Sequence, residues 1–241
     1  MQVYLNSIDG IADAFTSLLM SKRTWTREKE EELRRLCYAV TTREGFLRED
    51  ADAQNLAAFN KHMNALLKWG VHHITLLKFI DLSFTVEGMH RAGQDDWDSH
   101  AERFHNRIIR SSTRLADFHD GEVSEWYEDK IIPTDEALSI LRIPMPDTIE
   151  KDGITYVKGV NGYIRQGMEN NKDVKRGLYM LSIPSNFIFR CDLANFAHVY
   201  KQRGQHGGAN PEVKQGAEMM LNLLEIGQPT VTREVLLNVE I

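Results

Sequence analysis

The chain has 241 residues but only two cysteines, Cys37 and Cys191, which lie far apart in the sequence. Neither belongs to a CxxC pair, so the sequence indicates neither a disulfide framework nor a structural zinc site. We expect both to be small, buried side chains. Only Cys191 has an alternative role as a reactive thiolate, because it precedes an expected helix N-terminus, which would lower its pKa.

Positive charge is also scarce, since 29 Lys and Arg residues face 35 Asp and Glu residues, for a formal net charge of −6. A protein that coats nucleic acid needs clustered positive charge over a wide face, so this balance argues against binding to a nucleic-acid polymer. A pocket for a single nucleotide remains compatible with it.

Long apolar runs are missing as well, and none approaches the roughly 20 residues that span a bilayer. The N-terminal segment carries Asp9 and Asp13 among its apolar residues and does not have the form of a signal peptide. We therefore expect a cytoplasmic chain that does not bind membranes. No internal repeat is visible. The length fits one domain with inserted excursions at least as well as two, and we expect a single domain over residues 1–241.

Periodicity predicts the secondary structure of the N-terminal part. We expect a strand at Gln2–Asn6, then a helix capped by Asp9 that runs to Met20. Two more helices are expected at Thr26–Ala39 and Leu56–Leu67, before a strand at Ile80–Val86.

Turn signals mark the middle of the chain. Asp152-Gly153 and Asn161-Gly162 flank a β-prone run, which predicts a local β-hairpin excursion near residues 147–164. We read Gln94–His100 as a polar, acidic linker and Thr230–Ile241 as a β-prone segment.

Residues 192–224 hold two expected helices. Asp192 can cap the first one, and Leu193, Phe196 and Tyr200 follow at helical spacing. Arg203 lies on its last expected turn, before a glycine-rich loop that begins at Gly204. In the second helix, Asn210-Pro211-Glu212 reads as an N-cap, a first-turn proline and an acid at the positive helix end.

His72 and His73 form a pair whose role the spacing leaves open. A metal site is one reading, but no third or fourth ligand stands at a recognisable spacing. Structural histidines are another.

An arginine cluster occupies residues 103–114, where Arg103, Arg107, Arg110 and Arg114 lie within twelve residues. Arginine presents a planar fork of donors that binds phosphate in a bidentate manner, so the cluster suits a nucleotide phosphate. An exposed basic helix face is the alternative.

The C-terminal residues resemble a known signature. Asn195-x-x-His198-x-x-x-x-Arg203, a short loop and Ala209-Asn210-x-Glu212-Val213 are similar to the C-terminal motif of the flavin-dependent thymidylate synthases. The family has Asn-Leu-x-His-Phe-x-x-x-Arg and then Ala-Gln-x-Glu-Ile-Arg, so Asn210 and Lys214 are substitutions, and the loop has one extra residue. Arg176 falls where the family has an upstream nucleotide-binding arginine.

Two further segments resemble the same family less closely. Its Arg-His-Arg, spacer, Ser-x-Arg-Tyr motif corresponds to Ser112-x-Arg114, preceded by a scrambled Arg103, His105 and Arg107. His73-x-Thr75 resembles the family's His-x-Ser, whose residues face flavin and folate, and this gives the histidine pair a third reading.

The resemblance implies an α+β fold, with a central β-sheet flanked by long helices, and a cytoplasmic homotetramer with shared active sites. It implies thymidylate synthesis from deoxyuridylate, in which NADPH reduces FAD and methylenetetrahydrofolate supplies the one-carbon unit. No enzyme cysteine or metal is needed. The alternatives are a related deoxypyrimidine-modifying enzyme, for instance a hydroxymethylating one, or a non-catalytic nucleotide-binding homologue.

The resemblance also implies roles for individual residues. Arg203 would polarise the uracil ring and is the candidate catalytic residue. The substrate-binding residues would be Ser112, Arg114, Arg176 and Arg203. The cofactor-binding residues would be His73, Thr75, Arg103, His105, Arg107, Asp192, Asn195 and His198.

Overall fold

A computed structural model describes residues 1–99, 107–111, 123–127, 132, 134–159, 161–171, 178, 181–205 and 208–240. The chain divides into two compact units. The larger unit comprises Gln2–Val86, Asp96–Ile109 and Ile188–Ile241, and the smaller comprises Met1, Glu87–Asp95 and Arg110–Phe187. The single domain expected over residues 1–241 stays a prediction.

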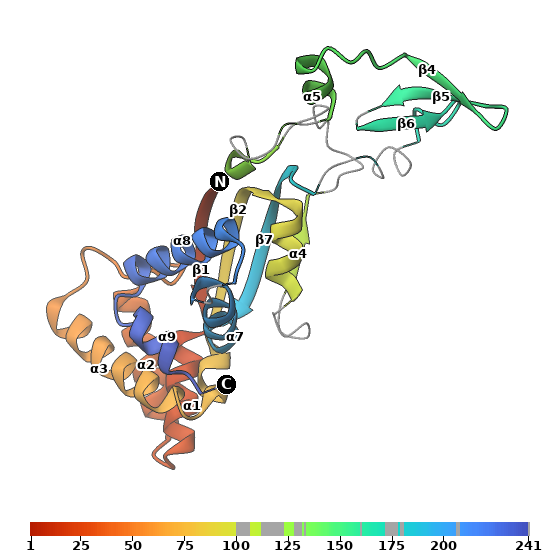
Figure 1. Cartoon of the computed structure of the whole chain (residues 1–241). Coiled ribbons are helices and arrows are strands. Elements are labelled where there is room, and N and C mark those ends of the chain that lie inside the picture. The colour runs from red at the N-terminus through yellow and green to blue at the C-terminus, as the bar shows by residue number, and fades with distance from the viewer. Residues whose placement is uncertain are drawn as a thin grey trace. The chain divides into compact units, whose positions relative to one another are not determined.

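The described residues combine helices and strands in an α+β architecture, as the sequence predicts (Figure 1). The helices are α1 (Ile11–Ser21), α2 (Arg27–Val40), α3 (Ala53–Gly70), η1 (Ile74–Phe79), α4 (Arg91–Ser99), η2 (Glu125–Tyr127), α5 (Thr134–Ile140), α7 (Leu193–Val199), η3 (Tyr200–Gln205), α8 (Pro211–Gly227) and α9 (Arg233–Asn238). The strands are β1 (Gln2–Asp9), β2 (Asp81–His90), β3 (Arg107–Arg110), β4 (Thr148–Lys151), β5 (Ile154–Gly159), β6 (Gly162–Arg165) and β7 (Pro184–Asp192).

Four strands form a sheet in the order β1-β2-β7-β3, and β1 and parts of the other three strands belong to the larger unit. Helix α8 packs against β1, and α1, α2 and α3 pack on one another (Figure 1). Helices α1 and α3 also pack on η1. Apolar side chains fill the space between these layers, and Phe84 of β2 stacks on Phe196 of α7 with ring centroids 5.5 Å apart. Both rings are fully buried, so this contact fixes α7 on the sheet.

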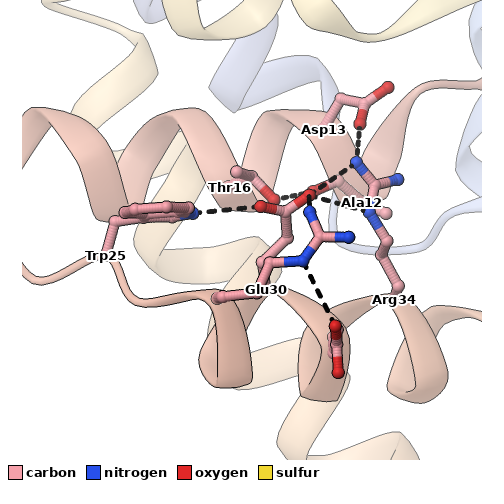
Figure 2. Close-up of polar contacts among 8 residues, drawn as sticks. Ala12, Asp13, Thr16, Trp25, Glu30 and Arg34 are labelled. Carbon is pink, nitrogen blue, oxygen red and sulfur yellow. Dashed lines mark hydrogen bonds and ion pairs between the residues drawn. The ribbon is translucent and has the colours of Figure 1, made fainter.

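An ion-pair network joins α1 to α2. Figure 2 shows Arg34 reaching both Asp13 and Glu30, with Nη2 2.6 Å from Asp13 Oδ1 and Nε 3.1 Å from Glu30 Oε1. Trp25 Nε1 donates to the other oxygen of Glu30 at 3.1 Å. The hydrogen bond from Trp25 and, next in size, that from Arg34 lower the pKa of Glu30. The carboxylate therefore stays charged although it is largely buried.

The smaller unit contains the three-stranded meander β4-β5-β6, as expected for residues 147–164. Lys151 pairs with Ile154 across the first turn, where Asp152 and Gly153 both take positive φ angles, 54° and 72°. Asn161, at φ 54°, lies in the second turn, directly before Gly162, which pairs with Gly159. Left-handed residues at these positions match the twist of adjacent strands, which confirms the hairpin prediction.

Asp9 is not the cap of the first helix, contrary to our expectation. It ends β1, and Gly10 takes the cap position with φ 81°, where a Cβ atom would lie 2.0 Å from the carbonyl oxygen of Phe79. The Asp9 carboxylate instead accepts from Arg190 Nη2 at 3.1 Å. Close main-chain approach therefore decides the start of α1.

Two other expectations were wrong. The supposed linker Gln94–His100 lies largely in helix α4, because Trp97 is fully buried and packs edge-on against Phe189 at 5.5 Å. The segment expected to be β-prone near the C-terminus contains helix α9, whose N-cap Thr232 accepts a hydrogen bond from the Val235 N–H. Tertiary burial and a capping hydroxyl outweigh the β-propensity of valine here.

Candidate functional site

A pocket of about 590 Å³ surrounds the segment that carries His73 and Thr75. It is lined by Ser17, Ser21, Trp69, His72, His73, Ile74, Thr75, Leu76 and Phe79. Both predicted cofactor residues have exposed side chains, so they can meet a ligand. The lining combines aromatic and aliphatic surface with hydroxyl and imidazole groups, a mixture that suits a heteroaromatic ligand with polar edges.

Trp69, at the end of α3, is the aromatic centre of this region. Its ring stacks on His73, with centroids 5.7 Å apart and planes 20° from parallel. Lys22 Nζ lies 4.7 Å from the Trp69 ring centroid, a cation–π contact. Trp69 also lines an adjoining pocket of about 480 Å³ together with Lys68, His72 and His73. The tryptophan thus holds His73 in place and brings positive charge near the pocket.

The helix that carries Asn195 and His198 begins at its predicted cap. Asp192 Oδ1 accepts a hydrogen bond from the Asn195 N–H at 2.8 Å, and Asp192 is 5% exposed. This confirms Asp192 as a cap. Its carboxylate satisfies a donor of its own chain, whereas its expected role toward a cofactor stays a prediction.

We expected the helix to end before Gly204, but it does not. It continues as η3, a π-helical turn over Tyr200–Gln205 that includes Arg203. A Cβ atom at position 204 would lie 2.6 Å from the Tyr200 ring, so glycine is required by packing rather than by chain reversal. Single π-helical turns are frequent at functional sites, because they displace a side chain from the regular helix path.

Arg203 is nearly buried, with its side chain 11% exposed. Its Nη2 lies 2.8 Å from Oδ1 of Asp96 in α4. A carboxylate of the same chain therefore holds the arginine that we expect to contact the substrate.

The second signature helix, α8, begins as predicted. Asn210 accepts from the Glu212 N–H at 3.0 Å, and Pro211 occupies the first turn. Glu212 is 1% exposed, which places this acid inside the fold at the positive helix end.

The segment that carries Thr75 contacts the helix that carries Asn195 and His198, and both belong to the larger unit. η1, which carries Thr75, packs against α7, and the Leu193 N–H donates to the Ile80 carbonyl at 2.8 Å. η1 thus touches both the pocket and α7, although no α7 residue lines the pocket. Arg107 lies apart from the pocket lining, with an exposed side chain on β3. Of the other predicted residues, Arg103, His105, Ser112, Arg114 and Arg176 lie outside the described residues.

Sequence reasoning missed three residues of this region. Trp69 and Phe79 are 43% and 47% exposed, and an aromatic residue before Gly70, next to a histidine pair, was a usable signal. Asp96 carried no signal, because it stood in a segment that read as a linker.

By its overall fold, the chain is similar to the flavin-dependent thymidylate synthases and has their α+β fold. One similar structure is thymidylate synthase X from Helicobacter pylori with FAD and dUMP, at 11% identity and a TM-score of 0.56, covering 98% of this chain and 100% of that chain. Another, also from Helicobacter pylori and complexed with FAD and dUMP, has 11% identity and a TM-score of 0.53, covering 96% and 100%. No family model and no curated protein matches the sequence.

A separate pocket of about 610 Å³ lies where β1 meets α1, beside the end of α2. None of the predicted site residues lines it, so it is not part of the candidate site. No group of three or more potential metal ligands occurs among the described residues.

Within the described ranges, every helix is too short or too polar to cross a membrane.

Proposed function

We propose that the chain binds deoxyuridylate and FAD and makes thymidylate by reductive methylation, with methylenetetrahydrofolate and NADPH as co-substrates. The observation that carries this proposal is that η1, whose Thr75 lines the pocket, packs on α7, the helix with Asn195 and His198. The same fold in Helicobacter pylori thymidylate synthase X was crystallised with FAD and dUMP.

The pocket lining fits part of a flavin. Trp69 and Phe79 offer apolar aromatic surface, and Thr75 and Ser21 offer hydroxyl groups for ring or ribityl oxygens. His73, held by stacking on Trp69, can donate to a ring or phosphate oxygen. Bound FAD would supply the hydride that completes the methyl group, while the protein positions the reactants.

Arginines would hold and polarise the nucleotide. C5 of uracil must become electron-rich, and a guanidinium near N3 and its neighbouring carbonyl oxygens favours the ionised ring. We assign this role to Arg203. Ser112, Arg114 and Arg176 would bind the phosphate and the ring, and the homotetramer would complete each site with residues of several subunits.

A cysteine nucleophile is not part of this mechanism. Cys191 is 1% exposed in β7, and burial raises the pKa of its thiol well above the usual value. The nearby carboxylates of Asp192 and Asp81 raise it further. A neutral, enclosed thiol cannot attack a pyrimidine ring.

The test is product analysis. Purified protein is incubated with deoxyuridylate, methylenetetrahydrofolate, FAD and NADPH, and the nucleotide product is identified by mass spectrometry. The methylated nucleotide is expected, and it should require FAD. Thr75→Val should slow its formation, whereas Thr24→Val, at an exposed threonine outside the pocket, should not. Absence of any modified nucleotide would refute the enzymatic proposal and favour a non-catalytic nucleotide-binding protein.

A second candidate is hydroxymethylation of the same nucleotide. Two residues expected to bind cofactor favour it: the Asp192 carboxylate accepts from a main-chain N–H, and Arg107 does not line the pocket of His73 and Thr75. Transfer of the one-carbon unit without the reductive step would give the hydroxymethyl nucleotide, with water as the source of its oxygen. In the product analysis, that mass without any need for FAD would support the second candidate.

A further inference from the structure

Arg203 has one buried donor, Nε, without a hydrogen-bond partner among the described residues. Within the described part of the chain, its Nη2 is paired with Asp96 Oδ1, whereas nothing accepts from its Nε. A buried donor without an acceptor costs free energy, so such groups in folded proteins usually form a hydrogen bond with a water, an ion or a ligand.

Asp96 is well placed to hold a guanidinium. It lies in α4 directly before Trp97, whose fully buried ring packs edge-on against Phe189. The Asp96 side chain itself is 33% exposed. The buried tryptophan thus fixes the helix, and the main chain of Asp96 beside it is held in place.

The main chain on the Arg203 side is also held. The Tyr200 hydroxyl donates to Glu218 Oε1 at 2.9 Å, and Gln205 Nε2 donates to the Tyr200 oxygen at 2.8 Å. Arg233 Nη2 lies 2.5 Å from the second oxygen of Glu218. These contacts clamp both ends of the π-helical turn, so the backbone of Arg203 is fixed between them.

We propose that Asp96 is a positioning residue: it holds Nη2 of the Arg203 guanidinium and leaves Nε for an oxygen of an ionised pyrimidine ring. This inference rests on the proposed function, because it assigns the partner of Arg203 within the same site. The planar fork makes the division of labour possible, since one edge can bind a carboxylate while the other binds a second acceptor. Without Asp96 the side chain could turn away, and its buried charge would lose its counter-ion.

The test is calorimetric binding of deoxyuridylate to the full chain and its variants. Asp96→Ala should weaken binding about tenfold or more, in line with the loss of one charge-assisted contact. Asp96→Asn keeps an oxygen acceptor of similar shape, so it should lose less. Asp95→Asn is the matched control: Asp95 precedes Asp96 in α4 but pairs with a different arginine, Arg110, and should bind normally.

A double variant separates positioning from general damage. If Asp96 acts through Arg203, adding Asp96→Ala to Arg203→Ala should change affinity no further. If Asp96→Ala does not fold, Asp96→Asn carries the comparison. Unchanged binding in the folded Asp96 variant would overturn the inference while the proposed function stands. Tighter binding would also overturn it, because Asp96 would then compete with the ligand. No binding by the wild type would overturn both.

Discussion

The hydroxyl of Tyr200 donates a hydrogen bond to Glu218 at 2.9 Å and so ties the π-helical turn to α8. Tyr200 is fully buried, and Arg233 lies over its ring at 5.8 Å. Burial first, and then the Glu218 carboxylate, raise the pKa of Tyr200 from 10.0 to about 12. The turn that carries Arg203 therefore depends on a neutral tyrosine.

This raised pKa predicts a loss of stability at alkaline pH. The fold favours the protonated phenol, so the contribution is complete below pH 10.0 and disappears as the pH rises through about 12. We expect the wild type to lose more unfolding free energy over this interval than Tyr200→Phe, which cannot ionise. Denaturant titrations at several pH values measure the difference, and parallel curves for the two proteins would contradict it.

Arg203→Ala should weaken deoxyuridylate binding by about 2 kcal/mol or more, since it removes a charge-assisted contact from a nearly dry position. It should also slow turnover at saturating nucleotide, because Arg203 is expected to polarise the ring. Lysine should substitute poorly, as a point charge cannot reproduce the planar fork. Calorimetry and steady-state kinetics test this, with the exposed Arg35→Ala on α2 as control. Equal affinities for wild type and Arg203→Ala would exclude Arg203 from the site.

Asp192 has an observed role as a cap and a predicted role toward flavin, and substitution can separate them. Asp192→Ala should lower stability by about 1 kcal/mol through loss of the cap, whereas Asp192→Asn should largely preserve the helix. Thermal unfolding measures the first effect and FAD titration the second. If Asp192→Asn is stable and binds FAD as the wild type does, a role of the Asp192 charge toward the cofactor is refuted. If it is stable but binds FAD weakly, both roles hold.

Cys191 should be inert. Because its thiol is enclosed and neutral, we expect no alkylation by iodoacetamide in the folded protein at neutral pH. Cys191→Ala should retain product formation and lose about 1 kcal/mol of stability through the small cavity. Loss of product in a folded Cys191→Ala protein would instead indicate a thiolate mechanism.

The parts that the sequence predicted share a local cause. Caps at Asp192 and Asn210, the Asp152-Gly153 turn and the amphipathic stripe of α8 are each specified within a few residues. Asp9 and α4 were misread because their states depend on distant groups: the Phe79 carbonyl excludes a side chain at position 10, and Phe189 packs on Trp97.

The candidate site was predictable to the same extent. His73-x-Thr75 and the α7 residues stood out as motifs, but the packing of η1 on α7 depends on tertiary structure. The contact between Arg203 and Asp96 joins a motif residue to a segment without one, so no local pattern could indicate it.

The most direct test of the account is a titration of FAD with the purified wild-type protein, with and without deoxyuridylate. Binding is measured by the quenching of flavin fluorescence. We expect saturable binding, tightened by the nucleotide, and a weaker response in His73→Ala, which removes the ring stacked on Trp69. Fluorescence that falls without saturation, or does not change at all in either condition, would contradict the flavin mechanism.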